Sequence, residues 1–241
     1  MQFQVVSDVH LESKEDFEIT PLAPYLILAG DIGHPRHDNY KRFIQRCSDN
    51  WEHVFLITGN HEYYGSVMSE VDDYIKETYD NGNVHFLNKE TYLLNDLLII
   101  GCTLWTDIPE RNHRYIKSNI NDYAYIRSAK GKKLTPQKSV EIHKEHLQFI
   151  LDNATRKCLI ITHHVAYDKM LDPKYKDTTV LNMAYGTDLT TYVNEHIKAW
   201  ITGHTHYSSE EKIGETIMFS NCVGHEGQVT GYDESRILTI F

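Results

Sequence analysis

Short apolar runs recur along the chain and indicate buried β-strands. Each run is four to six residues long and rich in Val, Ile, Leu or Phe, which is typical of a strand covered on both faces. Eight such runs predict strands at residues 3–7, 25–29, 53–58, 97–102, 158–162, 199–202, 216–220 and 237–241.

Between these runs, the polar and apolar positions predict helices in three places. Residues 66–80 carry an apolar face at helical spacing, and Gly82 follows as a stop signal. Residues 135–154 begin with Thr135, a suitable N-cap, and have proline at the first helical position. A third helix is predicted over 187–197. Helices that alternate with strands favour an α/β layered fold, although the strand-rich last third fits a simple doubly wound sheet less well.

The composition favours a single soluble domain over residues 1–241. Hydrophobic residues make up 41% of the chain, and no Pro/Gly/Ser-rich linker divides it. The four cysteines are scattered in apolar surroundings, as buried thiols of a reducing compartment are. The N-terminus lacks the pattern of a signal peptide, and no apolar run approaches the ~20 residues that span a bilayer. We therefore expect a cytoplasmic protein without a membrane segment.

The chain carries a net negative charge, but one segment is positively charged. A net charge of −10 argues against stable nucleic-acid binding, because proteins with that task carry a basic excess. Residues 111–133 depart from this balance: Lys and Arg dominate, and Asp122 is the one acidic residue. This segment is either a solvated loop or a cap that attracts an anionic substrate and stacks against something flat.

Polar side chains of the same few types follow five of the predicted strands. Ligands in open α/β sheets sit just outside the carboxyl ends of the strands. One such residue is usually a turn former or a helix cap, but five together predict a common site. The blocks are Asp8-Val9-His10, Gly30-Asp31, Gly59-Asn60-His61-Glu62, His163-His164 and Gly203-His204-Thr205-His206.

These side chains have the chemistry of a metal site. Carboxylate, imidazole and amide oxygen suit Mn²⁺, Fe²⁺ and Zn²⁺, and there are enough donors for two divalent ions that share an aspartate. Residues i and i+2 of an extended segment point to the same face. We therefore expect Asp8 and His10 to act together. For the same reason, His204 and His206 are expected to reach one cluster from one loop.

In this order, the blocks D-x-H, G-D, G-N-H-E, H and G-H-x-H resemble those of the calcineurin-like metallophosphoesterases. The resemblance extends from residue 8 to residue 206. It implies a four-layer α/β/β/α fold, in which two β-sheets are flanked by helices and the metal site lies at the carboxyl ends of the strands. It also implies a phosphoester hydrolase that uses two divalent metal ions (Mn, Fe or Zn).

The resemblance implies two sets of metal ligands that share Asp31 as a bridge. The first set is Asp8, His10, Asp31 and His206. The second set is Asp31, Asn60, His163 and His204. Many relatives carry proline soon after the histidine that matches His163, and this chain does not. His164 therefore stays open as the alternative ligand, and its other role would be to support His163.

The implied reaction is hydrolysis by a hydroxide that bridges the metals and attacks phosphorus in line. His61 and Asn60 are the expected catalytic residues: His61 protonates the leaving oxygen, and Asn60 withdraws charge from the phosphoryl oxygens. Glu62 or another carboxylate is expected to orient His61. His225, near the C-terminus, is expected to be an ordinary surface histidine.

The expected substrate is a small phosphoester, and a nucleotide-like diester is favoured over a monoester. Residues 103–133 are expected to form a cap or insert over the site. In this cap Arg111, Arg114 and Tyr115, together with His164, are the predicted substrate contacts. The alternatives are a phosphomonoesterase or protein phosphatase, a nuclease of the same superfamily, and a non-catalytic protein-binding scaffold.

Overall fold

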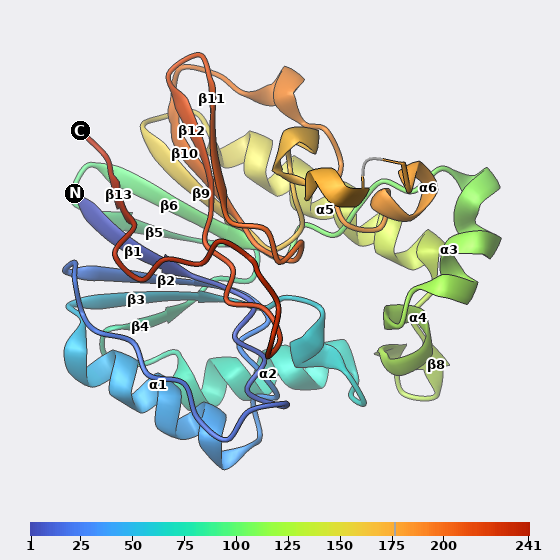
Figure 1. Ribbon diagram of the computed structural model, residues 1–241, viewed down its shortest axis with the longest axis horizontal. Coiled ribbons are helices and arrows are strands. Elements are labelled where there is room, and N and C mark those ends of the chain that lie inside the picture. The colour runs from blue at the N-terminus through green and yellow to red at the C-terminus, as the bar shows by residue number, and fades with distance from the viewer. Residues whose placement is uncertain (176) are drawn as a thin grey trace.

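Two β-sheets packed face to face form the centre of the protein (Figure 1). The computed structural model describes residues 1–175 and 177–241. In the first sheet β1 to β4 run parallel, and β13 is antiparallel to β1. Its strand order is β13 (Ile237–Thr239), β1 (Gln2–Val6), β2 (Tyr25–Ala29), β3 (His53–Ile57) and β4 (Val84–Phe86).

The second sheet has four parallel strands between two antiparallel edge strands. Its order is β11 (Ser209–Ile213), β12 (Thr216–Ser220), β10 (Ile197–Thr202), β9 (Cys158–Thr162), β6 (Leu97–Cys102) and β5 (Glu90–Leu94). All eight predicted strands are present. The prediction missed β4, β5, β11 and a small hairpin of β7 (Arg127–Ala129) and β8 (Lys132–Lys133).

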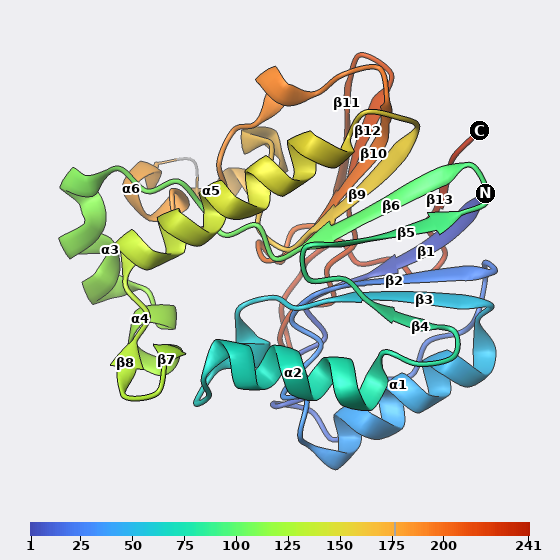
Figure 2. The ribbon, with the colours of Figure 1, turned by 180° about the vertical axis from the view of Figure 1, so that it is seen from behind.

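Helices cover the outer faces of both sheets. Successive strand residues point to opposite faces, so Val5 packs between the sheets while its neighbour Val6 packs toward the helices. The helices α1 (Asp38–Asn50) and α2 (Met68–Tyr79) lie under the first sheet, and α5 (Pro136–Asn153) lies over the second (Figures 1 and 2). The predicted four-layer α/β/β/α fold is therefore confirmed.

Two of the three predicted helices are present, and the third prediction was wrong. In α5 the side chain of Thr135 accepts a hydrogen bond from the backbone of Lys138, as an N-cap does. Residues 187–197 instead contain a short 3₁₀ turn over Thr190–Tyr192, and β10 begins at Ile197. The Asp188 side chain accepts the backbone N–H of Thr190, a local hydrogen bond that competes with helix formation.

Several short helices gather beyond the carboxyl ends of the strands (Figures 1 and 2). They are α3 (His113–Asn119), α4 (Asp122–Tyr125) and α6 (Thr179–Asn182). The segment 103–133, expected as a cap or insert, supplies α3, α4 and the β7–β8 hairpin. Among the described residues, no helix is both long and apolar enough to cross a membrane.

Candidate active site

Five loops at one edge of the paired sheets bring the predicted ligands together. The loops follow β1, β2 and β3 of the first sheet and β9 and β10 of the second. Because these strands are parallel within each sheet, their carboxyl ends lie at a common edge. The side chains collected there are Asp8, His10, Asp31, Asn60, His61, His163, His204 and His206.

The backbone is left-handed at several of these residues. The φ angle is 56° at Asp8, 56° at His10 and 54° at Asp31. It is 70° at His204 and 49° at His206. Such angles are uncommon outside glycine, though Asp and His tolerate them better than most residues, and strain of this kind concentrates at functional sites. The segments Asp8–His10 and His204–His206 were expected to be extended. This expectation was wrong, because left-handed φ angles turn the backbone there.

His10, His206 and Asp8 form the first donor group. The Nε2 atoms of His10 and His206 lie 2.9 Å apart, and Asp8 Oδ1 lies 3.5 Å from His206 Nε2. The Nδ1 atom of His10 contacts Glu12 Oε1 at 2.8 Å. That of His206 contacts Gln228 Oε1 at 2.6 Å. Each ring is thus held through Nδ1 and presents Nε2 to the same point, as metal-binding histidines typically do.

Asp31, Asn60, His163 and His204 form the second donor group. His163 Nε2 lies 3.2 Å from Asp31 Oδ2 and 3.2 Å from Asn60 Oδ1, while its Nδ1 donates to the backbone oxygen of Ala29 at 2.8 Å. A ring nitrogen of His204 lies within 4.8 Å of ligand atoms of Asp31 and His163. His204 and His206 therefore belong to different groups, although both come from one loop.

Asp31 belongs to both groups. Its carboxylate also lies within 4.8 Å of ring nitrogens of His10 and His61. Burial disfavours its negative charge, but the nearby rings of His163, His61 and His10 hold the pKa of Asp31 well below its usual range. A carboxylate at this position can be shared by two cations.

His164 lies beside the second donor group, with its ring centroid 4.4 Å from that of His204, but it belongs to neither donor group. Its Nδ1 contacts the backbone oxygen of Thr103 at 3.2 Å, and its ring packs 5.0 Å from that of Trp105. Burial and the neighbouring His163 lower the pKa of His164 to about 3. It is 1% exposed and does not border the cavity described below. His163 therefore has the contacts expected of a ligand, whereas the structure does not place His164, predicted as a substrate contact, at the cavity.

His61 lies beside the two groups and is held by Glu12 rather than by Glu62. Its Nδ1 contacts Glu12 Oε1 at 2.8 Å, which leaves Nε2 available to another molecule. Burial opposes protonation, but Asp31 and Glu12 raise the pKa of His61 to about 9. Glu62 is fully buried and accepts four backbone N–H groups from the loops after β2 and β3, at 2.7–3.3 Å. Glu62 therefore shapes these loops, and the carboxylate that contacts His61 is the other alternative of the expectation, a different carboxylate, here that of Glu12.

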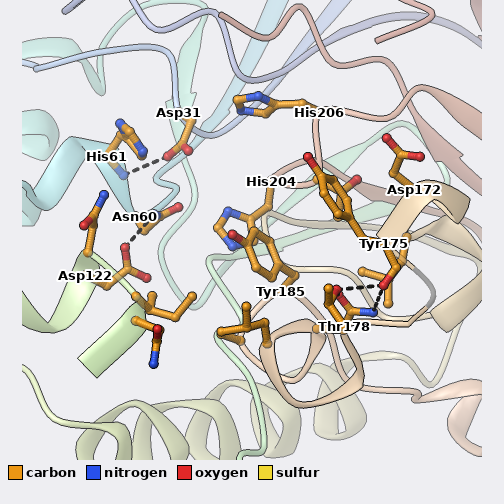
Figure 3. A pocket seen from close by; sticks show the side chains of 18 of the residues that line it. Asp31, Asn60, His61, Asp122, Asp172, Tyr175, Thr178, Tyr185, His204 and His206 are labelled. Atoms are coloured by element: carbon orange, nitrogen blue, oxygen red, sulfur yellow. Dashed lines mark hydrogen bonds between the residues drawn. The ribbon is translucent and has the colours of Figure 1, made fainter. Parts of the chain in front are cut away.

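A cavity of about 430 Å³ opens beside the donor groups (Figure 3). His61 and Asn60 border it on one side, and Tyr175 lies on the other, with His204 and Tyr185 between them. Tyr185 stacks on His204 with ring centroids 4.9 Å apart.

The predicted substrate contacts Arg111, Arg114 and Tyr115 do not border this cavity. All three are exposed and lie at or before the first turn of α3, whereas Asn119 at the other end of the helix lines the cavity. A seven-residue helix is about 10 Å long, so the first turn of α3 can lie outside the cavity while its last residue lines it. The role of Arg111, Arg114 and Tyr115 as substrate contacts therefore stays a prediction, and the structure does not place them at this cavity.

Four further residues around the site were missed as site residues by the sequence reasoning. Asp122, from α4, accepts a hydrogen bond from Asn60 Nδ2 at 2.8 Å and another from the Tyr64 hydroxyl at 2.8 Å. The sequence feature that could have identified Asp122 is that it is the one acidic residue of the basic segment 111–133. Glu12 follows His10 by two residues, which was the only hint of its contact. The remaining two, His225 and Gln228, come from the C-terminal segment and border the cavity.

The donor set fits divalent metal ions. Carboxylates and imidazoles converge from several loops, and each of three histidines is held through Nδ1 with its Nε2 directed at other donors. Two imidazole Nε2 atoms at 2.9 Å compete for one proton, whereas a cation between them would satisfy both. Fold and donor chemistry together define a protein of two packed sheets with a candidate site for divalent metal ions at their common edge.

The chain belongs to the calcineurin-like phosphoesterase family, a family of metal-dependent phosphoester hydrolases; the family model matches residues 1–208. The chain is 32% identical to an uncharacterized protein of Acanthamoeba polyphaga mimivirus, across 98% of this chain and 95% of that protein.

Two solved structures share the fold. The phosphopantetheinyl hydrolase of Mycobacterium tuberculosis is 15% identical, with a TM-score of 0.74, over 93% of this chain and 89% of that one. The protein TT1561 of Thermus thermophilus is 11% identical, with a TM-score of 0.54, over 97% and 90%. The predicted family and the predicted hydrolase activity are confirmed.

Proposed function

We propose that the protein hydrolyses small phosphodiesters with two divalent metal ions. The observation that carries this proposal is the meeting of two donor groups at Asp31, beside a cavity large enough for a small organic group. Asp8, His10 and His206 would hold one ion, and Asn60, His163 and His204 the other. When bound, two such ions acidify a water molecule and draw charge from the phosphoryl oxygens.

The protein's own residues position the substrate and the proton. The contact of Asn60 with Asp122 fixes its amide, so that Oδ1 lies toward His163. Because Glu12 holds His61 through Nδ1, Nε2 is the nitrogen from which a proton would pass to the leaving oxygen. Leu171, Leu181 and Ile120 supply apolar surface for the organic group of the substrate.

The charges around the cavity favour a diester over a monoester. Among the described residues that border it, Lys174 is the one Lys or Arg, and it is paired with Asp172 at 2.5 Å. Asp122 adds a further carboxyl group to the wall. A monoester carries close to two negative charges at neutral pH and a diester only one. The carboxylates therefore penalise the monoester more.

Two observations bear on the rival functions. The Mycobacterium tuberculosis neighbour is by name a phosphopantetheinyl hydrolase, so the same fold belongs to a hydrolase there. A nuclease is less favoured here, because Arg111 and Arg114 lie outside the cavity. A non-catalytic scaffold has no need for two intact donor groups or for a histidine held beside them.

The test compares bis(p-nitrophenyl) phosphate with p-nitrophenyl phosphate after the protein is stripped of metal and reloaded with Mn²⁺. We expect kcat/KM for the diester to exceed that for the monoester by about tenfold or more, a difference of ~1.4 kcal/mol in transition-state binding. Without Mn²⁺ both activities should be absent. A monoester turned over equally well would overturn the diester preference, and no turnover with Mn²⁺ bound would favour the scaffold.

The control for the active site is His61→Ala. This variant should lose ~10²–10⁴ in kcat, because it lacks the proton donor, while its bound Mn²⁺ stays equal to that of the wild type. An H61A protein that had lost its metal would show that His61 is a ligand instead.

A further inference from the structure

His225 lies in a C-terminal segment that the family match does not reach. The match ends at residue 208, and the sequence reasoning expected an ordinary surface histidine. The side chain is solvent-exposed, as expected, but it also borders the cavity. Its ring centroid lies 4.1 Å from that of His10 and 5.0 Å from that of His206.

The loop that carries His225 is fixed to the loop after β1. The backbone N–H groups of Val223 and Gly224 donate to the oxygens of Ser7 and Asp8, both at 2.9 Å. Lys14 Nζ donates to the oxygen of Gly224 at 2.8 Å. Gly224 has a φ of 77°, and a Cβ there would lie 2.5 Å from Thr230. The path of the loop is therefore built into the fold, and it brings His225 to the first donor group.

One side chain links His225 with His206. Gln228 Oε1 accepts the backbone N–H of His225 at 2.9 Å and also contacts His206 Nδ1 at 2.6 Å. The Gln228 side chain thus fixes the backbone at His225 and also holds the ring of His206, a proposed metal ligand. Ring nitrogens of His10, His206 and His225 all lie within 4.8 Å of one another. Three imidazoles at such distances, each from a different loop, form a recognisable cation site.

We propose that His225 is a further ligand of the metal ion held by Asp8, His10 and His206. This inference rests on the proposed function, because it takes the first donor group as a metal site. An additional neutral imidazole would strengthen binding of that ion and would favour nitrogen-preferring metals such as Zn²⁺ and Co²⁺ over Mn²⁺. The second ion would be unaffected.

The test measures metal binding without substrate. Metal-free wild type and His225→Ala are titrated with Zn²⁺ against a competing chromophoric chelator, and the Co²⁺-loaded forms are compared by visible absorption. In H225A we expect one of two ions to bind roughly tenfold or more weakly, the other to bind as before, and the Co²⁺ bands to change. Val229→Ala is the matched control, since this side chain of the same loop is 94% exposed; it should match the wild type. Thermal unfolding of the metal-free proteins checks that both variants fold.

The outcomes separate this inference from the proposed function. If the wild type binds no divalent ion, both the role of His225 and the proposed function are wrong. Wild type that binds two ions, with H225A unchanged in Zn²⁺ affinity and Co²⁺ spectrum, would refute the role of His225 alone. Steady-state kinetics with the diester then distinguishes a substrate contact: unchanged metal binding in H225A with an altered KM would place His225 on the substrate, which also contradicts the inference.

Discussion

At the scale of single residues, the orientation of Asn60 depends on a neighbour from outside the motifs. Its Nδ2 donates to Asp122 Oδ1 at 2.8 Å, which turns the amide oxygen toward His163. An amide that can rotate would present its NH₂ group to a cation part of the time, and this group cannot act as a ligand. Asp122 is therefore a positioning residue.

Substituting Asp122 tests this role. Asp122→Ala should lower kcat by about tenfold to a hundredfold, because Asn60 is no longer held. Asp122→Asn keeps an acceptor oxygen and should recover most of the activity. Steady-state kinetics with the diester measures both variants. Tyr64→Phe is the control. It removes the hydrogen bond that the Tyr64 hydroxyl donates to Asp122 and keeps the one that Asn60 donates to Asp122. Equal activity of D122A and wild type would contradict the positioning role.

The limits of sequence reasoning are visible in the same residues. Asp31 and His206 could be predicted as site residues, because each follows an apolar strand within a block of known order. Asp122 follows no strand, His225 lies in the loop after β12, and neither belongs to such a block. Their contacts depend on how α4 and the C-terminal loop pack against the sheets. A single sequence contains no local signal for that packing.

At the scale of elements, burial decided which strands could be predicted. The strands β2 and β9 are covered on both faces and read as continuous apolar runs. The edge strands β5 and β11 alternate between exposed and partly buried positions, as in Ser-Glu-Glu-Lys-Ile of β11, so neither forms a continuous apolar run, and both were missed. The helix α1 was missed as well: it has no side-chain N-cap and buries only one narrow face.

The helix α5 carries a buried histidine that should make the fold sensitive to acid. His146 is 4% exposed, and its Nδ1 accepts the backbone N–H of Leu104 at 3.0 Å. Burial, with smaller effects of Lys89 and His143, lowers its pKa from 6.5 to about 3. Below pH 6.5 the unfolded chain therefore binds a proton that the folded protein excludes, and stability falls as the pH falls.

Replacing this histidine should remove part of the acid sensitivity. In His146→Gln the amide oxygen can still accept the Leu104 N–H, and no proton is taken up on unfolding. Between pH 7 and pH 5 the wild type should lose about 2 kcal/mol more free energy of unfolding than the variant. Urea unfolding at the two pH values measures the difference. An identical loss in both proteins would show that His146 takes up no proton on unfolding in this range.

At the scale of the whole molecule, the candidate site joins the two sheets. Asp8, Asp31 and Asn60 follow strands of the first sheet, whereas His163 and His206 follow strands of the second. Hydrogen bonds already cross between them: His163 Nδ1 donates to the backbone oxygen of Ala29, and the Asp8 carboxylate accepts the backbone N–H of His204. Metal ions held by these side chains would cross-link the sheets at the edge where loops with left-handed residues meet.

Metal binding should therefore stabilise the fold as a unit. Ions that bind only the folded protein, each at a hundredfold excess over its Kd, add about 2.7 kcal/mol per site. For a domain of this size that corresponds to a rise in Tm of about 5–10 °C per site. Calorimetry of the chelator-treated protein during Mn²⁺ addition measures the rise. Asp31→Asn should show a much smaller rise, because this carboxylate joins both donor groups. A wild-type Tm that did not respond to Mn²⁺ would mean that these loops do not share the ions.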